Sequence, residues 1–439
     1  MDIEQIREYI ADFNKKEIPI FIERRLKVSE TNKIVSIIGP RRAGKTYFLF
    51  QIMKHLLDRG IEKNQMLHLN FEDTRLLNIN YQEIREILKM QYQLYPSQNK
   101  DFYLFIDEPQ NIDKWEHAVR SLHDEGIKIF ITGSSSKILS REIATSLRGR
   151  GNPYILLPFS FGEYLSIKNI VYDPKKLGTK DKSNLLRDTE DYMEFGGFPE
   201  ILKEEDRDEK LKLLSNYFEL VVYKDMMERH KLKNSNLVKW LLKSIISSFA
   251  KEISINKIYK TLKSQGIKAS KNTLYSYLSL LEDAFFAFPL NKFSYSDRKK
   301  DLSSNKIYIN DPSFAKLIEI SRDFGRKMEN IVFLEIFRDK KPLEDISYWK
   351  NTQQEEVDFV ISRFKKVEQL IQVCYDISNR DTKNRELRAL IKASKELKCN
   401  NLLVITFDYG GEEIFEWFGI KRKVRFIPVW KWLLDKTLD

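Results

Sequence analysis

The sequence contains very little cysteine: only Cys374 and Cys399 occur in 439 residues. Two thiols cannot form a disulfide framework or a CxxC metal site, and such scarcity is typical of proteins from a reducing compartment. The N-terminus lacks a basic segment followed by an apolar one, and no apolar run approaches the ~20 residues that cross a bilayer. No internal repeat or low-complexity segment is present either. We therefore expect a cytoplasmic protein without a membrane anchor.

The composition is otherwise that of an ordinary folded protein. Hydrophobic residues make up 42% of the chain and aromatic residues 12%. This content is ample for hydrophobic cores and argues against intrinsic disorder. A chain of this length usually forms several domains, so we expect two to four of them.

Positive charge is concentrated in one segment. The net charge is +11, and residues 231–300 contain 14 Lys or Arg against 4 Asp or Glu, a balance of +10. A localised basic surface is what nucleic-acid binding requires. The alternative is a lysine-rich face that only contacts solvent.

The most specific motif is a glycine-rich loop of the pattern G-x-x-x-x-G-K-[ST]. Residues 33–38 (KIVSII) predict a short buried strand before it, and residues 47–57 predict a helix that begins inside the motif. Such a loop cradles phosphates with its backbone N–H groups and the helix N-terminus. Lys45 would reach the β- and γ-phosphates, and Thr46 would ligate Mg²⁺. The alternative, a chance glycine-rich turn, is disfavoured by the correct flanks. The expected ATP-binding residues are Gly39, Pro40, Arg41, Arg42, Ala43, Gly44, Lys45 and Thr46.

Strands and helices alternate through this part of the chain. Apolar strands are predicted at residues 65–71, 102–106, 127–131 and 153–157, and helices at residues 81–95 and 115–124. This alternation is typical of a parallel sheet covered by helices, with the nucleotide at the carboxyl ends of the strands. Before the first strand, Arg24 and Arg25 could contact the nucleotide or simply pack on the surface.

Two carboxylates follow the apolar strand at residues 102–106, as in a Walker B motif. Asp107 would hold Mg²⁺, and Glu108 would polarise the attacking water as a general base. An Asp-Glu pair after a strand can also be a helix N-cap, an alternative that the upstream P-loop disfavours.

Polar and basic side chains follow in the next segment. Thr132 or Ser134, at the end of the strand at residues 127–131, would lie between the two motifs and could sense the γ-phosphate or the water; a helix cap is the alternative. Arg148 or Arg150 could stabilise the transferring phosphoryl group as an arginine finger. Surface loop charge is the alternative for both arginines.

The combination of motifs resembles one group of AAA+ proteins, the archaeal and bacterial ATPases of the "archaeal ATPase" type. The motifs are GPRRAGKT, FED at residues 71–73, LFIDEPQ, TGSSS, LRGR, PFSFGEYL and FGGFPE. The resemblance covers nearly the whole chain, with looser motifs in the C-terminal part. It implies an AAA+ core, a winged helix and a restriction-endonuclease-like domain. It also suggests ring assemblies, although no residue requires one.

The expected organisation is α/β, with a P-loop NTPase core at residues 1–167. A linker and helical lid would occupy residues 168–230, with residues 168–190 as the connection and a largely helical stretch at residues 192–229. A winged helix would occupy residues 231–305, with helices at residues 237–249, 254–264 and 271–281 and a β-wing at residues 284–293. The third helix would be the recognition helix, and Lys268, Lys271 and Tyr275 would contact DNA. Docking of a protein is the alternative use of such a domain.

The C-terminal domain is expected at residues 306–439, with the order helix, three strands, helix, strand after an initial strand at residues 306–310. By resemblance to endonuclease sites, Glu329 and Asp358 take the positions of metal ligands. Gln372 replaces an acid and Cys374 replaces the lysine, while Lys365 or Lys366, from the neighbouring hairpin, is the alternative source of a lysine. We expect a vestigial site and a poor nuclease or none.

The function that these features favour is a Mg²⁺-dependent ATPase whose cycle changes how the C-terminal half holds DNA. The first alternative is a nucleotide-dependent switch that docks a protein partner. The second is an ATP-driven nuclease.

Overall fold

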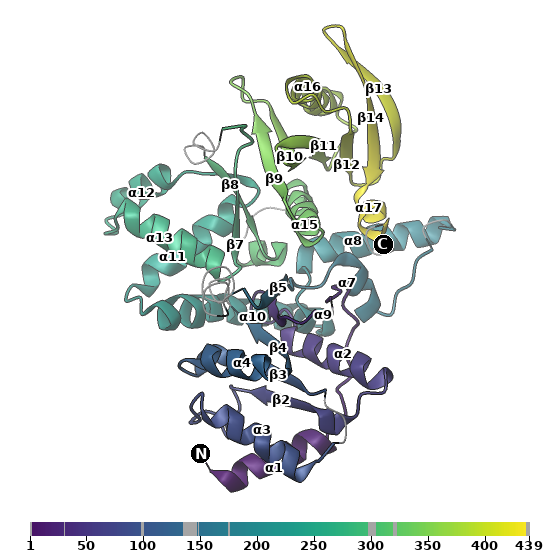
Figure 1. The fold of residues 1–439 in the computed structure, drawn as a ribbon. Helices are drawn as coiled ribbons and strands as arrows, with labels where there is room; N and C mark the ends of the chain where they lie inside the picture. Colours follow the sequence, from purple (N-terminus) through teal and green to yellow (C-terminus); the bar gives the residue numbers. More distant parts are fainter. Residues whose placement is uncertain are drawn as a thin grey trace. The chain divides into compact units, whose positions relative to one another are not determined.

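The predicted strands of the N-terminal part pair into one parallel sheet in the computed structural model (Figure 1). The strand order is β2-β3-β4-β1-β5, and every neighbouring pair is parallel. This arrangement confirms the predicted α/β core. The strands are β1 (Ile34–Ile38), β2 (Met66–Asn70), β3 (Tyr103–Asp107), β4 (Lys128–Gly133) and β5 (Gly151–Ile155).

The structure describes residues 2–29, 31–97, 101–134, 147, 149–173, 176–296, 304–318 and 323–435. The chain divides into two units. The first comprises Met1–Leu157 and Asp283–Phe285, and the second comprises Pro158–Glu282 and Phe286–Asp439. Among the described residues, no helix is both long and apolar enough to cross a membrane.

Helices cover the parallel sheet because each buries an apolar stripe against it. The spacing of Val119 and Leu122 in α4, for example, places both on one buried face. Residues 19–26, which precede β1, form neither helix nor strand. The helices are α1 (Ile3–Lys15), α2 (Lys45–Asp58), α3 (Glu83–Leu94) and α4 (Trp115–Asp124), with short 3₁₀ turns at Lys63–Gln65 and Pro109–Asn111.

The second unit begins with helices where a connection was expected. Residues 168–190 are polar, yet α8 runs through Thr179–Phe195, because Leu185, Thr189 and Tyr192 recur at helical spacing and are buried. The helix ends at Gly196, whose φ of 69° suits glycine, and a Cβ there would lie 1.7 Å from a carboxylate oxygen of Asp311. The other helices here are α7 (Phe161–Ile167), α9 (Pro199–Lys203), α10 (Arg207–Leu220) and a π-helical turn at Val221–Glu228.

Three helices and a small antiparallel sheet follow. The helices agree closely with those expected: α11 (Ser235–Ser248), α12 (Ile255–Ser264) and α13 (Lys271–Asp283). The sheet has the order β6-β8-β7 and contains β6 (Lys251–Ile253), β7 (Ala287–Leu290) and β8 (Asn305–Ile309). The division by sequence places β8 at the start of the C-terminal domain, but this strand pairs with β6 and β7.

The C-terminal part contains a mixed six-stranded sheet of the order β13-β14-β12-β11-β10-β9. The expected order of helix, three strands, helix and strand is present as α15 to β12; a β-hairpin and a helix, which the sequence did not predict, follow it. The elements are α15 (Phe324–Arg338), β9 (Glu344–Lys350), β10 (Glu356–Arg363), β11 (Lys366–Cys374), α16 (Arg380–Glu396), β12 (Leu402–Thr406), β13 (Gly411–Trp417), β14 (Ile420–Pro428) and α17 (Val429–Asp435), with a 3₁₀ segment at Pro312–Ile318 before them.

Candidate nucleotide-binding site

The P-loop lies between β1 and α2, and its backbone packs closely against neighbouring segments of the first unit. Gly39 has a φ of 152°, and a Cβ there would lie 2.0 Å from the carbonyl oxygen of Leu156. Only glycine therefore allows the loop to pass so close to the end of β5. Arg24 is buried, and its guanidinium donates to the carbonyls of Ala43 (2.8 Å) and Leu157 (2.6 Å). This arginine thus anchors the loop by its backbone.

Lys45 is the first residue of α2, and its ammonium turns back into the loop. Its Nζ donates to the carbonyls of Gly39 (3.2 Å) and Pro40 (3.0 Å), and the residue is only 6% exposed. The same nitrogen lies 3.9 Å from Oε1 of Glu108. The cation is therefore held at the N-terminus of a helix, where backbone N–H groups also favour anions.

Asp107 ends β3 and receives two hydroxyl groups. Thr46 donates to its Oδ2 at 2.5 Å, and Thr132 donates to its Oδ1. The carboxylate is 3% exposed. Burial raises its pKa and the neighbouring Glu108 raises it further, while the hydrogen bonds from Thr132 and Thr46 act in the opposite direction. One carboxylate and one hydroxyl meet here from two motifs that are 61 residues apart.

This pair of oxygen ligands fits Mg²⁺ in the way that nucleotide enzymes use it. Mg²⁺ is usually held by one or two carboxylates together with substrate phosphates and water. A cage of three or more His, Cys, Asp or Glu residues is not needed, and none is found among the described residues. Thr46 and Asp107 are therefore suitable ligands for a nucleotide-bound Mg²⁺.

Glu108 is the residue after Asp107 and is 8% exposed. Its φ of 51° is unusual for a side chain with a Cβ, and such strain clusters at functional sites. Its Oε2 accepts hydrogen bonds from Ser134 (3.2 Å) and from the amide of Gln110, and its N–H donates to Thr132 Oγ1 (3.3 Å). The carboxylate is thus fixed in one orientation.

Thr132 and Ser134 come from the end of β4, and β4 lies between β3 and β1 in the sheet. They therefore occupy the predicted place between the two motifs. Both hydroxyl groups contact the Walker B carboxylates, an arrangement that orients Asp107 and Glu108. Their role as sensors of the γ-phosphate remains a prediction.

Arg150, one of the two candidate arginine fingers, is not brought to this site. Arg150 precedes β5 beside the start of β1, at the sheet edge opposite the P-loop, and it pairs with Asp124 through two bonds of 2.9 and 3.1 Å. In its own chain it therefore forms a surface ion pair and does not reach the P-loop. Arg148 lies outside the described residues.

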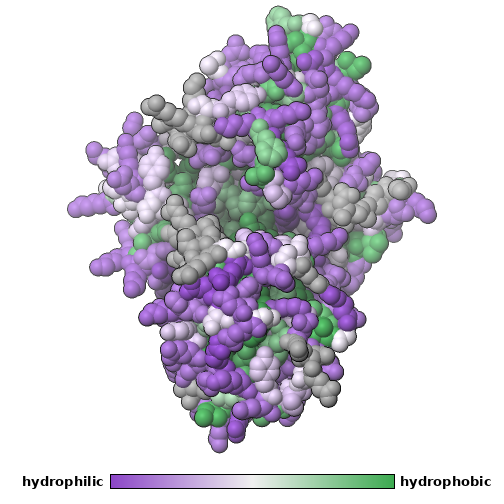
Figure 2. All heavy atoms as spheres, in the orientation of Figure 1, coloured by the Kyte–Doolittle hydropathy of each residue, from purple (hydrophilic) through white to green (hydrophobic). Residues whose placement is uncertain are grey.

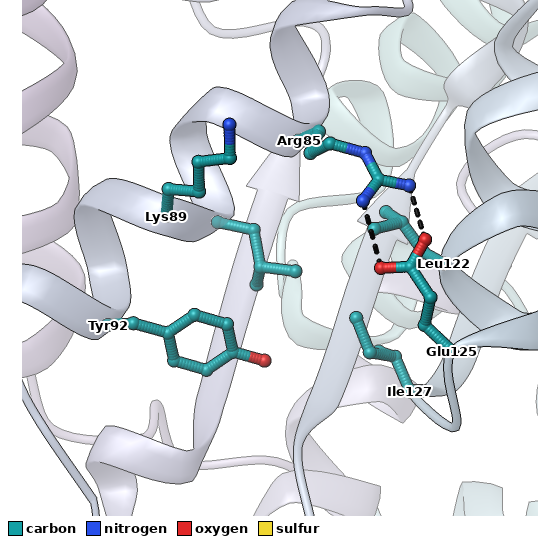
Figure 3. Close-up of a pocket in the computed structure, with 7 residues that line it drawn as sticks. Arg85, Lys89, Tyr92, Leu122, Glu125 and Ile127 are labelled. Carbon is teal, nitrogen blue, oxygen red and sulfur yellow. Dashed lines mark hydrogen bonds and ion pairs between the residues drawn. The ribbon is translucent and has the colours of Figure 1, made fainter.

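A pocket between α3 and α4 contains none of these residues. Figure 3 shows that the side chains of Arg85 and Glu125 face each other at this pocket, and Nη1 of Arg85 donates to Oε2 of Glu125 at 2.9 Å. The pair is more than 40% exposed and contributes little to stability. Nothing in this pocket suggests nucleotide chemistry.

The expected DNA-binding residues lie on the surface of the second unit. Lys268 and Lys271 are exposed, and Tyr275 is 56% exposed. Ser270 accepts a hydrogen bond from the N–H of Thr273 (3.0 Å) and so caps α13. The side chains that project from the region of α12 and α13, at the left of Figure 2, are hydrophilic.

The residues of the expected vestigial site also converge, but with an unexpected lysine. Glu329 of α15 and Asp358 of β10 both contact the ammonium of Lys306, and Gln372 accepts from the N–H of Asp358 (3.3 Å). Lys365 and Lys366 are instead exposed at the hairpin turn. The only sequence signal for Lys306 is a charged residue within an otherwise apolar strand. Cys374 is buried, and burial raises its pKa to about 12, so it packs as a small apolar residue.

Comparisons with known proteins divide the chain into three parts. Residues 31–165 match an AAA domain, residues 186–323 a domain of unknown function (DUF8612), and residues 324–431 a second such domain (DUF4143). The uncharacterized protein MJ1544 of Methanocaldococcus jannaschii is 41% identical over 406 residues, which cover 92% of this chain and 88% of that protein. An uncharacterized protein of Haemophilus influenzae is 28% identical over 367 residues, covering 81% and 86%.

Solved structures give only weak similarity. The Orc1 protein of Aeropyrum pernix in complex with DNA is 12% identical over 70% of this chain and 88% of that one, with a TM-score of 0.28. AMPPCP-bound DnaA of Aquifex aeolicus is 13% identical over 64% and 86%, with a TM-score of 0.23. TM-scores of this size do not show that the folds are shared.

Proposed function

This chain belongs to the same family as the uncharacterized M. jannaschii protein and carries an AAA domain; from this premise we propose that it is a Mg²⁺-dependent ATPase of the AAA+ class. It would hydrolyse ATP to ADP and phosphate. The observation that carries this proposal is the convergence of Lys45, Thr46, Asp107 and Glu108 at the carboxyl edge of one parallel sheet.

Each residue has a distinct task in this mechanism. The P-loop N–H groups and the N-terminus of α2 bind the phosphates, and Lys45 exchanges its loop carbonyls for β- and γ-phosphate oxygens. Thr46 and Asp107 would hold Mg²⁺, which neutralises charge on the transferring phosphoryl group. Glu108 accepts a proton from the attacking water, and Ser134 holds the carboxylate toward that task.

Phosphate release from ATP by the purified full chain tests the proposal. Turnover should require Mg²⁺, and it should be lost when Lys45 is changed to Ala, because the cation that binds the β- and γ-phosphates is removed. Binding of a fluorescent ATP analogue should weaken in the same variant. A circular dichroism spectrum like that of the parent chain is the control for folding. Turnover at the parent rate in Lys45→Ala would show that the P-loop is not the site of hydrolysis.

We also propose that the nucleotide cycle acts on DNA through a basic surface formed by α12, α13 and the turn between them. The basic residues of this segment are exposed, and Lys271 lies with its Nζ 5.6 Å from the centre of the Tyr259 ring. Exposed cations beside aromatic rings can contact phosphates and bases. The residues in this group are Lys257, Lys260, Lys263, Lys268, Lys271 and Tyr275.

Exchange of Lys268 and Lys271 for Glu should weaken DNA binding at low salt and reduce its salt dependence, because each phosphate contact releases counterions. ATP turnover without DNA should be unchanged. The control is the double exchange Lys395→Glu/Lys398→Glu, which makes the same change of charge at exposed positions elsewhere in the second unit. Fluorescence anisotropy with a labelled duplex measures the affinity. If both double variants bind DNA as the parent does, the basic surface docks a protein and the switch function becomes the better interpretation.

A further inference from the structure

The acidic residues of the C-terminal domain surround a buried ammonium group. Nζ of Lys306 lies 2.7 Å from Glu329 Oε1, 2.7 Å from Glu356 Oε1 and 3.1 Å from Asp358 Oδ1. Lys306 is 2% exposed, so this charge is removed from water. A buried lysine is stable only when its charge is paired and its donors are used.

The ammonium donates to Glu329 Oε1 and Asp358 Oδ1, and Glu356 Oε1 completes its surroundings as an ion pair. Two further donors reach the cluster: the N–H of Val373 donates to Asp358 Oδ2 (2.9 Å), and Tyr308 donates to Glu329 Oε1 (2.7 Å), the oxygen that also faces Lys306. Burial opposes the charge of Lys306, but the neighbouring carboxylates, Glu329 foremost, outweigh it and hold its pKa well above the ordinary value. The lysine is therefore a permanent cation at the centre of three acids.

That centre is where a divalent cation would have to bind. Metal–oxygen distances are about 2.0–2.6 Å for Mg²⁺ and Ca²⁺, so a metal ion at this point would overlap the ammonium and repel it. The arrangement of Glu329, Glu356 and Asp358 thus does not fit a metal while Lys306 is in place. We propose that Lys306 acts as an internal counter-ion that takes the place of a divalent metal and closes a latent cation site in the C-terminal domain.

A catalytic lysine would require a different arrangement. Such a lysine must present a donor to water or substrate, whereas the ammonium of Lys306 is enclosed and lies within 3.1 Å of an oxygen of each of three carboxylates. The geometry therefore favours closure over catalysis.

The closing lysine comes from a separate sheet. Lys306 belongs to β8, which pairs with β6 and β7, while Glu329 and Asp358 belong to α15 and β10. The chain after β7 also joins the C-terminal sheet: the N–H of Phe293 donates to the carbonyl of Tyr348 in β9 (2.7 Å). The β6-β8-β7 sheet thus supplies the charge that completes the C-terminal core.

Binding of Mn²⁺ to the nucleotide-free full chain tests this proposal. Electron paramagnetic resonance counts bound Mn²⁺, and comparison with the parent cancels any ion held at the P-loop. Lys306→Ala should bind one Mn²⁺ more than the parent, because three carboxylates are left without a cation. The further change Asp358→Asn should abolish this extra site. Mn²⁺ should also raise the melting temperature of Lys306→Ala by several degrees more than that of the parent.

Two additional variants keep the test decisive. Lys316 pairs with Glu194 at 2.9 Å, so Lys316→Ala removes a paired lysine without leaving three acids and should gain no Mn²⁺ site. If Lys306→Ala does not fold, the double variant Lys306→Ala/Glu329→Gln removes one positive and one negative charge and so keeps the net charge of the cluster. It should bind one Mn²⁺ that the parent does not bind, more weakly than a site with three carboxylates would. Equal Mn²⁺ binding by this double variant and the parent would overturn the proposal. So would metal-dependent DNA cleavage by the parent that Lys306→Ala abolishes, because Lys306 would then be a catalytic lysine.

Discussion

Exchange of Glu108 for Gln separates hydrolysis from nucleotide binding most cleanly. The side chain keeps its size, and its amide oxygen can still accept the hydrogen bonds of Ser134 and Gln110 that Oε2 accepts now. The amide nitrogen then takes the position of Oε1, 3.9 Å from the Lys45 ammonium. The variant should therefore fold and hold the same rotamer, but it has no group that accepts a proton.

The expected loss follows from the missing base. General bases typically contribute a factor of about 10²–10⁴ in rate. A fall of about 100-fold in kcat corresponds to about 2.7 kcal/mol of transition-state stabilisation. ATP affinity should change little or become slightly tighter, because one negative charge near the phosphates is removed. Single-turnover phosphate release measures the rate, and anisotropy of a fluorescent ATP analogue measures the affinity.

Glu72 provides a matched control. It follows β2, is more than half exposed, and lies 3.9 Å from Arg41 of the P-loop. Burial, and then the charge of Glu108, raise the pKa of this carboxyl. Glu72→Gln should retain most of the turnover. If Glu72→Gln loses turnover while Glu108→Gln hydrolyses ATP at the parent rate, Glu72 is the base and the assignment from the Walker B order is wrong.

Three further outcomes follow from particular contacts. Thr132→Val should reduce Mg²⁺-dependent turnover about tenfold or more, because valine lacks the hydroxyl group that donates to Asp107. A Mg²⁺ titration of ATPase activity measures this effect, and a titration curve like that of the parent would contradict it. Gly196→Ala should lower the free energy of unfolding by roughly 3 kcal/mol, because the alanine adds backbone strain and steric overlap. Gly266 has a similar φ of 72° but no atom within 4 Å of an added Cβ, so Gly266→Ala should cost only about 1 kcal/mol. Thermal unfolding measures both values. His68 is buried, and burial is the main reason that its pKa is lowered to about 4, so the unfolded chain takes up a proton near pH 6.5 and the folded chain does not. The free energy of unfolding is therefore at its full value above pH 6.5 and falls by up to about 3 kcal/mol as the pH drops toward 4. A His68→Leu variant whose melting temperature depends on pH as steeply as that of the parent would refute this.

Local sequence was enough for the strands of the parallel sheet and for the P-loop. The helical period marks α4 to the residue, and the glycine pattern with its flanks marks the P-loop. These features depend on neighbours in the chain: backbone freedom at Gly39 and alternating or continuous apolar residues in the strands. The placing of Thr132 between two motifs also followed, because parallel strands end at one edge of their sheet.

Contacts between distant segments lay beyond that reach. The sequence shows α8 as a polar stretch, since the apolar partners of Leu185 and Tyr192 are elsewhere in the chain. It shows β8 as one more apolar strand, whereas pairing with β6 and β7 carries Lys306 to three acids from α15 and β10. The sequence also allows Arg150 to be an arginine finger, whereas in the folded sheet this residue lies at the edge opposite the P-loop. In each case the position of the segment is determined by burial or charge pairing between residues that are 20 or more positions apart, and a local sequence pattern contains no information about such contacts.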